Sequence, residues 1–434
     1  MNLLLSTAFA LFAGLLMTRL FKVLHLKLPD VTAFLVAGVL VGPFLIGRIG
    51  VPGLGFASME EISSVGFLSN VALGFIAFDI GNEFRLATLR HTGKTATVVG
   101  IVQAVSAALC VDAVLILLHF VLGKDVLPLP VAITLGAIAS ATAPAATLMV
   151  VRQYKAKGPL TDLLLPIVAL DDAVGLVLFA VSIGIAQALE GGSISVISVF
   201  VNPLIEILCS VILGSIMGFL LTLLEKLFFS NKNRLSLTIA FVIMTIALAA
   251  VKIPLGPVRI SFSSLLVCMM LGTMFCNLSE YSVDIMKRSE RWTAPLYTVF
   301  FVLSGAQLDL SVFTKPLSVM IGVAYILVRC FGKYFGARIS SGLMRCDANV
   351  KKHLGITLVP QAGVALGMVV SAQVLGDEMG SMIRNIILFS VLVYELVGPL
   401  LTKMSLQKAG EILPAADDSA NRARFEKKEE ATTA

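Results

Sequence analysis

The chain has 434 residues, of which 57% are hydrophobic and only 14% are charged, and its mean hydropathy is +0.95. This composition excludes a soluble globular domain and indicates a polytopic membrane protein. The formal net charge of +6 is compatible with nucleic-acid binding, but the positions of the basic residues explain it better, so we expect no nucleic-acid partner. The six cysteines lack metal-binding spacing and the four histidines are scattered, so we expect no metal cluster and no cofactor.

Long apolar runs predict an all-α fold with about thirteen membrane-spanning helices. The predicted spans are residues 2–21, 30–47, 63–82, 95–123, 129–151, 160–189, 194–224, 235–253, 260–278, 293–310, 316–337, 352–375 and 381–402. The first run resembles a signal peptide, because Ala8-Phe9-Ala10 looks like a cleavage site. Since the positive charges Arg19 and Lys22 follow this run instead of preceding it, we interpret it as the first span.

Basic residues are concentrated in every second loop. One set of loops carries 19 of them: Arg19, Lys22, Lys27, Arg85, Arg90, Lys94, Arg152, Lys155, Lys157, Lys226, Lys232, Arg234, Lys287, Arg288, Arg291, Arg338, Arg345, Lys351 and Lys352. The alternate loops carry six: Arg48, Lys124, Lys252, Arg259, Lys315 and Arg384. The positive-inside rule therefore predicts an external N-terminus and a cytoplasmic C-terminus in the inner (plasma) membrane. Residues 407–434 are polar and predict a disordered cytoplasmic tail.

A short motif recurs at the ends of the third and tenth spans. Residues 81–86 read GNEFRL and residues 305–310 read GAQLDL, 224 positions later. An odd number of spans separates the two copies, so they have opposite orientations in the membrane. The sequence therefore predicts an inverted repeat of six spans, a linker span and six further spans, as found in many secondary transporters.

The sixth span contains two adjacent aspartates near its middle, Asp171 and Asp172, which are the only charged residues between Leu163 and Leu189. A carboxylate costs roughly 2.5–3.5 kcal/mol at the centre of a membrane, so an acid there is a candidate functional group. Neighbours on a helix point about 100° apart, so one can meet a protein partner while the other faces a cavity. The alternative is a pair neutralised by burial or by a salt bridge for packing.

Two spans at equivalent positions of the repeat contain proline. The fifth reads GAIASATAPAATLMVV with Pro144, and the twelfth reads GITLVPQAGVALGMVV with Pro360. Either proline alone predicts a simple kink, but the pair favours two broken helices that cross near the membrane midplane. Thr142 can then supply a hydroxyl ligand at the break; the alternative is an ordinary helix threonine bonded to its own backbone.

The eleventh span places Arg329 and Lys333 one helical turn apart on one face. Two buried cations require anions, and Asp171 or Asp172 is the natural partner; the alternative is that they reach toward the cytoplasmic end. A buried lysine can release its proton, whereas arginine stays charged.

Two further acids are weaker candidates. Glu395 lies 224 residues after Asp171 and is its mate in the repeat. It is either a second acid of the site or a helix cap. Asp112, in the fourth span, could pair with the end of a broken helix.

Through these residues, the chain resembles the monovalent cation/proton antiporter superfamily, in its branch of bacterial sodium/proton antiporters with a double aspartate. The similarity extends from Leu28 to Leu406. It rests on the ordered set LPDVTAFLVAGVLVGP, TAPAA, ALDDAVG, FFVLSGAQLDL, GKYFG and VPQAGVALG. The presence of the double aspartate and the lack of a large soluble domain differ from regulated potassium efflux systems.

The resemblance implies a homodimer and an elevator-like motion of one domain against another. The implied divisions are a dimer domain (1–90 and 231–312), a core domain (91–190 and 313–406) and a linker helix (191–230). It also implies that Asp172 is the main cation-binding carboxylate, that Asp171 pairs with Lys333, and that Thr142 lies where the broken helices cross. Arg329 departs from this pattern by adding a second cation, which leaves the identity of the basic partner open.

The sequence therefore predicts a secondary transporter, not an enzyme, that exchanges sodium and also lithium for protons in an electrogenic cycle. Hard oxygen ligands suit these cations, and aspartates that bind a cation when deprotonated cannot do so when protonated. A potassium/proton antiporter and a sodium-coupled symporter of an organic anion remain as alternatives. A channel is disfavoured because one double aspartate in an inverted repeat does not build a symmetric pore.

Overall fold

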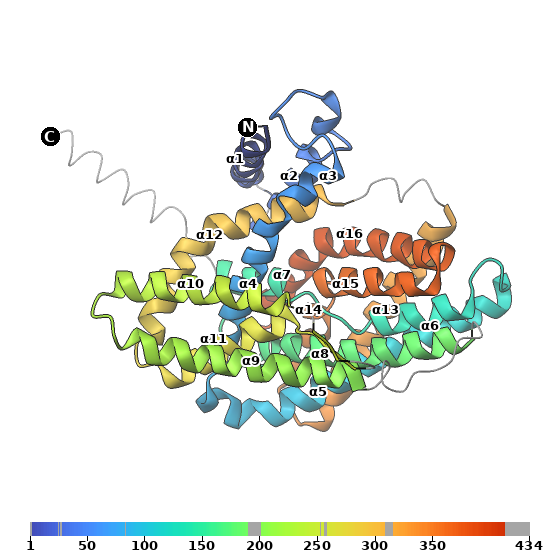
Figure 1. The fold of residues 1–434 in the computed structure, drawn as a ribbon. Helices are drawn as coiled ribbons and strands as arrows, with labels where there is room; N and C mark the ends of the chain where they lie inside the picture. The colour runs from blue at the N-terminus through green and yellow to red at the C-terminus, as the bar shows by residue number, and fades with distance from the viewer. Residues whose placement is uncertain are drawn as a thin grey trace.

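The computed structural model describes residues 2–24, 26, 28–82, 84–189, 201–251, 253–255, 258–308 and 316–412. The described chain is almost entirely helical (Figure 1). The elements of its first half are α1 (Asn2–Val23), α2 (Asp30–Val41), η1 (Ile46–Ile49), α3 (Met59–Ser64), α4 (Gly66–Asn82), α5 (Leu86–Leu122), α6 (Leu129–Ile138), α7 (Pro144–Gln153), α8 (Pro159–Leu189) and α9 (Asn202–Glu225). Those of its second half are α10 (Asn231–Ala249), β1 (Ile253–Leu255), β2 (Val258–Ile260), α11 (Ser264–Leu278), α12 (Ser282–Ala306), α13 (Pro316–Leu343), α14 (Ala348–Thr357), α15 (Gly363–Ser371), η4 (Ala372–Leu375) and α16 (Asp377–Lys408).

The predicted thirteen spans are confirmed by these helices within the described residues, and residues 194–200, 252 and 309–310 of the predicted spans lie outside them. Eleven of them correspond to α1, α2, α4, α5, α8, α9, α10, α11, α12, α13 and α16. The fifth corresponds to α6 followed by α7, and the twelfth to α14 followed by α15. Within the described residues, eight helices are long and apolar enough to cross a membrane on their own. The broken spans fall below that length because each is built from two half-helices.

The connection between α10 and α11 is a short hairpin that the sequence analysis missed. Strands β1 and β2 pair antiparallel, with Ile253 opposite Ile260 and Leu255 opposite Val258. Each strand is three residues long, and the apolar residues of both merge with the flanking helical runs. The hairpin therefore shortens the predicted spans 235–253 and 260–278 without changing the topology.

The repeated glycine motif has a packing role in both copies. A side chain at Gly81 of α4 would come within 1.9 Å of the Met269 carbonyl oxygen of α11. A side chain at Gly305 of α12 would come within 2.2 Å of the Leu35 carbonyl oxygen of α2. The two glycines thus allow equivalent close approaches of helix backbones in the two halves of the inverted repeat. Asp309 and Leu310 of the second copy lie outside the described residues.

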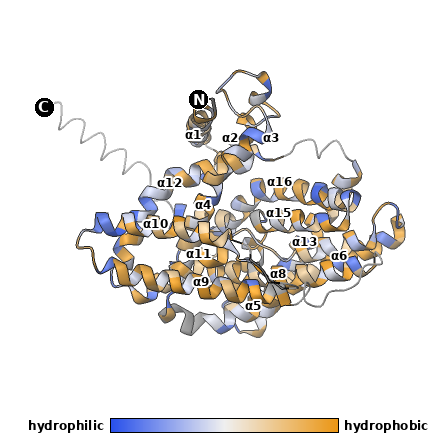
Figure 2. Cartoon of the chain, in the orientation of Figure 1, coloured by the Kyte–Doolittle hydropathy of each residue, from blue (hydrophilic) through white to orange (hydrophobic). Residues whose placement is uncertain are grey.

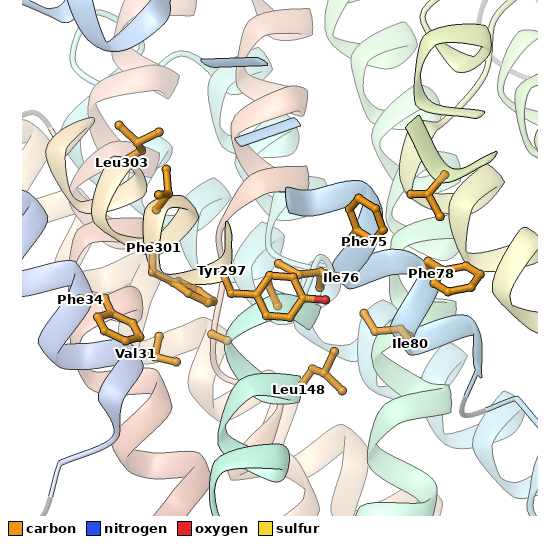
Figure 3. Packing of buried hydrophobic residues seen from close by; sticks show 14 of the residues in the cluster. Val31, Phe34, Phe75, Ile76, Phe78, Ile80, Leu148, Tyr297, Phe301 and Leu303 are labelled. Atoms are coloured by element: carbon orange, nitrogen blue, oxygen red, sulfur yellow. The ribbon is translucent and has the colours of Figure 1, made fainter. Parts of the chain in front are cut away.

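The helices pack in two groups, which we call the left-hand and right-hand groups because α10 and α12 lie toward the left of Figure 1 and α6 and α13 toward the right. In the left-hand group, α1, α2, α4, α9, α10, α11 and α12 surround an apolar cluster that includes Phe34, Phe75, Phe78, Tyr297 and Phe301 (Figure 3). In the right-hand group, α5, α6, α8, α13, α14, α15 and α16 pack on one another. Helix α7 contacts helices of both groups and therefore lies at the boundary between them.

The surface of several helices is apolar, as expected for contact with lipid. In α9, Leu204, Leu208, Ile212, Ile216 and Phe219 are each about half exposed or more. Hydrophobic residues cover most of α9 and α5 in Figure 2. A helix that is apolar on its outward face as well as on its packed face needs hydrocarbon, not water, around it.

The end of the last helix is tied to α8. Helix α16 continues to Lys408, and Glu411 is buried against the first turn of α8. The Glu411 carboxylate accepts hydrogen bonds from the backbone N–H groups of Leu160 (2.6 Å) and Thr161 (2.8 Å). Residues 407–412 of the predicted tail are therefore ordered structure, and residues 413–434 lie outside the described part of the chain.

Candidate functional site

Two helix breaks cross at the centre of the right-hand group. Helix α6 ends at Ile138 and α7 begins at Pro144, while α14 ends at Thr357 and α15 begins at Gly363. Proline lacks the amide hydrogen that a continuing helix needs, and it is well placed in the first turn of a new helix. The Ala143 N–H donates to the Pro360 carbonyl at 2.8 Å, which joins the two breaks directly. Pro144 thus starts a half-helix, and Pro360 lies inside the opposing break.

Arg329 holds the two breaks together. This guanidinium, from α13, is fully buried and donates to the carbonyl oxygens of Ala139 (2.9 Å) and Ala141 (2.6 Å) after α6. It also donates to the Val359 carbonyl after α14, at 2.6 Å. Both helix C-termini carry partial negative charge and free carbonyl groups. The permanent charge of Arg329 compensates both ends, and the ring of Tyr394 lies 4.7 Å from it.

Lys333, one turn further along α13, forms an ion pair with Asp171. Its Nζ atom lies 2.9 Å from Asp171 Oδ2, and both side chains are fully buried. Lys333 also donates to the Thr142 hydroxyl (2.9 Å) and to the Ser140 carbonyl (2.5 Å) in the first break. Between the two candidate cations, the structure therefore places Lys333 on Asp171 and Arg329 on backbone carbonyls.

Asp171 accepts hydrogen bonds on both carboxylate oxygens. Thr142 donates its hydroxyl to Oδ2 at 2.5 Å. Gln103 of α5 donates its amide to Oδ1 and also to the Gly100 carbonyl. Sequence reasoning missed Gln103, although a glutamine inside the apolar run of α5 was a signal for a buried polar partner. Four helical segments, namely α5, the α6–α7 break, α8 and α13, thus meet at one carboxylate.

A second pair of missed residues supports the crossing from the other side. Gln361, in the second break, donates to the Ile138 carbonyl at the end of α6 at 2.8 Å. Its amide is also hydrogen-bonded to the Tyr325 hydroxyl, and both residues are fully buried. Gln361 follows Pro360 directly, so its position in the break was available from the sequence, but its partner was not.

The other predicted site residues are distributed around this cluster. Asp172 follows Asp171 in α8, and its side chain is outside the described part of the structure. Asp112 packs against Gly136 near the end of α6, where its Oδ1 atom has no hydrogen-bond partner among the described residues. Glu395 lies in α16, and its Oε2 atom is likewise buried without such a partner. The structure does not bring Asp112 or Glu395 into hydrogen-bonding contact with Asp171.

A cavity of about 560 Å³ opens between the two helix groups. Its walls include the start of α4, the end of α12, the first turn of α7 and the start of α15. Glu395 lines it, as do the polar side chains of Asn70, Ser304 and Gln307. The lining residues Ala143–Ala146 follow Thr142 directly, so the cavity reaches the edge of the first helix break.

The opposite end of α7 is held by polar contacts to the left-hand group. Arg152 Nη1 lies 2.5 Å from Asp79 Oδ2 of α4, and its Nε lies 3.5 Å from Glu290 Oε1 of α12. Asp79 is fully buried and accepts a second hydrogen bond from the Tyr297 hydroxyl, which points toward α4 in Figure 3. The Gln153 side chain also accepts a hydrogen bond from the backbone N–H of Asp30, at 2.9 Å. We call Asp79, Arg152, Gln153, Glu290 and Tyr297 the α7 anchor.

The Asp171–Lys333 pair should contribute strongly to stability. Removing one partner of a buried ion pair leaves an uncompensated charge and costs about 3–5 kcal/mol. We expect Lys333→Gln and Asp171→Asn each to lower the free energy of unfolding by this amount, and the double variant to lose less than the sum of the two. Thermal unfolding of the purified protein in detergent measures this cycle. Strict additivity of the two losses would contradict the pairing, and Lys232→Gln, at an exposed lysine of α10, serves as the control.

An inverted repeat whose two broken helices cross at a buried charged cluster defines a secondary transporter of the membrane. The family model described as "Sodium/hydrogen exchanger, transmembrane" matches residues 7–408, and the chain belongs to this family. The predicted resemblance is thereby confirmed, as are cation/proton exchange as the activity of the family and the multi-pass membrane character of the chain.

Solved structures share the fold. The sodium proton antiporter MjNhaP1 from Methanocaldococcus jannaschii at pH 8 is 18% identical, with a TM-score of 0.64 and coverage of 94% of this chain and 97% of the other. A 3D EM map structure of the same antiporter is also 18% identical, with a TM-score of 0.69 and coverage of 94% and 98%. A comparison with curated protein sequences finds no match.

Proposed function

We propose that this protein exchanges sodium, and also lithium, for protons by an electrogenic elevator-type cycle. The observation that carries the proposal is the buried ion pair of Asp171 and Lys333 at the crossing of the two helix breaks. A carboxylate and an amine in this position can each bind or release a proton, whereas Arg329 keeps its charge and holds the scaffold. The cluster is thus suited to couple a cation to protons.

The chemistry of exchange follows from competition for the aspartates. Sodium and lithium prefer hard oxygen ligands, which Asp171, Asp172 and the Thr142 hydroxyl would supply. When Asp171 turns to the cation, Lys333 loses its counter-charge and a buried amine without a partner releases its proton. Asp172, which is protonated when no cation is bound in this proposal, releases a second proton as it binds the cation. Two protons then leave for one cation, which makes the cycle electrogenic. The potassium efflux alternative would use the same carboxylates with a larger cation.

The two ends of α7 support alternating access. One end borders the 560 Å³ cavity, and the other is closed by the α7 anchor. With the predicted orientation, the cavity opens to the outside and the anchor lies at the cytoplasmic side. In our proposal α5–α8 and α13–α16 move together as the core domain, and the anchor separates when the site turns inward. The left-hand group without α9, which would be the linker helix, would form the dimer domain of a homodimer in the plasma membrane.

A direct assay tests the proposal. The purified protein is reconstituted in liposomes that contain a pH-sensitive dye, and sodium, lithium and potassium are titrated in turn. We expect proton movement on addition of sodium or lithium without any organic solute. A response to potassium alone would favour the potassium/proton antiporter, and a response that requires an organic anion would favour the symporter.

Glu395 is proposed as a second acid on the route from the cavity to the site. Glu395 lines the cavity, and its Oε2 atom is buried without a hydrogen-bond partner among the described residues. We expect Glu395→Gln to raise the sodium concentration needed for half-maximal exchange about tenfold or more, while the maximal rate changes less. The dye assay measures both. The control is Ser390→Ala, a buried residue of the same helix that bonds only to the Ile386 carbonyl; an unchanged sodium dependence in Glu395→Gln would contradict the role.

A further inference from the structure

A second pocket lies between α13, α14 and α16, and its chemical character differs from that of the transport site. Its volume is about 340 Å³, and it is lined by Tyr334, Lys352, His353, Ile356, Leu401, Met404, Ser405 and Lys408. No carboxylate is among these residues. The polar side chains that line it are two lysines, a histidine, a serine and a tyrosine, all of which can donate hydrogen bonds.

The basic residues of this pocket are not used in the fold. Lys352 and Lys408 are exposed and form no ion pair within the described part of the chain. His353 is 5% exposed, yet its Nδ1 atom has no hydrogen-bond partner among the described residues. The Tyr334 hydroxyl already accepts a hydrogen bond from Arg338 at 2.8 Å, which leaves its own proton to donate. A buried polar atom without a partner in a basic pocket indicates an anion as ligand.

The remaining wall favours an amphipathic anion. Ile356, Leu401 and Met404 line the same pocket, and Met404 is 41% exposed. On α13, Phe331 and Phe335 lie within the predicted span and are 55% and 40% exposed, and the Phe335 ring packs against Tyr334 of the pocket, as expected for side chains that face hydrocarbon. The pocket therefore lies where an apolar surface meets the basic end of the molecule, the position at which transmembrane helices bind anionic headgroups.

We propose that this pocket binds the phosphate of an anionic phospholipid, with Lys352 and Lys408 as the charged donors and the acyl chains along Met404 and α13. The proposal does not depend on the proposed transport function: Tyr334 follows Lys333 in α13, but no side chain that lines the pocket forms a hydrogen bond or ion pair with Asp171 in the described part of the chain. Free phosphate shares the charged chemistry but not the acyl chains, so the two sources can be separated by experiment.

The test is the thermal stability of the purified full-length protein in a neutral detergent with added lipid. We expect phosphatidylglycerol to raise the unfolding midpoint by several degrees more than phosphatidylcholine, and the double variant Lys352→Gln/Lys408→Gln to lose at least half of this difference. The control is Lys226→Gln/Lys232→Gln, which removes two exposed lysines at the end of α9 and the start of α10 and should keep the full difference.

Two results would overturn the proposal. If the double variant keeps the full response to phosphatidylglycerol, the pocket is not the lipid site. If inorganic phosphate at the same concentration gives the same stabilisation as phosphatidylglycerol, the ligand is a free anion and not a lipid. Because stability is measured without a cation gradient, these results do not depend on whether the protein exchanges sodium for protons.

Discussion

Replacing Asp172 with asparagine should abolish cation-induced proton movement while the protein still folds. Asparagine has nearly the shape of aspartate but loses both the negative charge and the exchangeable proton. Asp172 follows Asp171 in α8, about 100° further around the helix, and Asp171 already has Lys333, Thr142 and Gln103 as partners. We therefore expect Asp172 to be the carboxylate whose loss removes transport with little loss of stability.

The measurement is sodium-driven proton movement in liposomes, together with thermal unfolding of the same preparation. The matched control is Asp162→Asn, which makes the same chemical change at an exposed residue in the first turn of the same helix. It should retain exchange at nearly the rate of the unmodified protein. Near-normal exchange by Asp172→Asn would show that this residue is not part of the cation site, whatever the result for the control.

Joining α7 to α4 at the α7 anchor should stop transport reversibly. In the elevator proposal Arg152 must leave Asp79 each time the site changes sides, so a covalent link between these positions blocks the cycle. Cysteines replace Asp79 and Arg152 in a background whose six native cysteines are replaced by alanine. A bifunctional methanethiosulfonate reagent then spans the distance that the long arginine side chain bridges in the native contact. Exchange should fall to background and return when the link is reduced.

A second cross-link shows whether the effect is specific to the moving boundary. The guanidinium of Arg234 in α10 lies 3.5 Å from the ring of Tyr281, directly before α12, and α10 and α12 both belong to the left-hand group. Cysteines at Arg234 and Tyr281, linked by the same reagent, should leave exchange intact because no relative motion is proposed there. Full activity of the linked Asp79–Arg152 protein would show that α4 and α7 do not separate during transport.

The parts of the site that could be predicted from the sequence are those with a local cause. Proline removes a backbone donor, yet Pro166, Pro295 and Pro399 lie inside continuous helices. Pro144 and Pro360 predicted breaks because they occupy equivalent spans of the repeat, and Asp171, Lys333 and Arg329 are conspicuous because charge is costly in an apolar span. The free-energy cost of a charge in an apolar span also predicted that Asp171 pairs with a basic residue. The breaks and the thirteen spans were therefore predictable without coordinates.

The parts that could not be predicted depend on where backbone groups meet in space. Arg329 was a candidate partner of a carboxylate, but its ligands are carbonyl oxygens at the ends of α6 and α14. Backbone acceptors carry no sequence signature, because every residue has one. Gln103 was missed for a related reason, since a single amide in an apolar helix does not indicate its partner 68 residues away.

The hydrogen bonds of Glu411 bear on how the chain is assembled during synthesis. This carboxylate completes the N-terminus of α8, the helix that carries Asp171, yet Leu160 and Glu411 are 251 residues apart. When α8 leaves the ribosome and inserts, its first amide groups have no protein acceptor and must donate their hydrogen bonds to water. The helix at the centre of the site thus receives its cap only after the last span has been translated. A chain that ends just before Glu411 would therefore contain every span but would lack the carboxylate that caps α8.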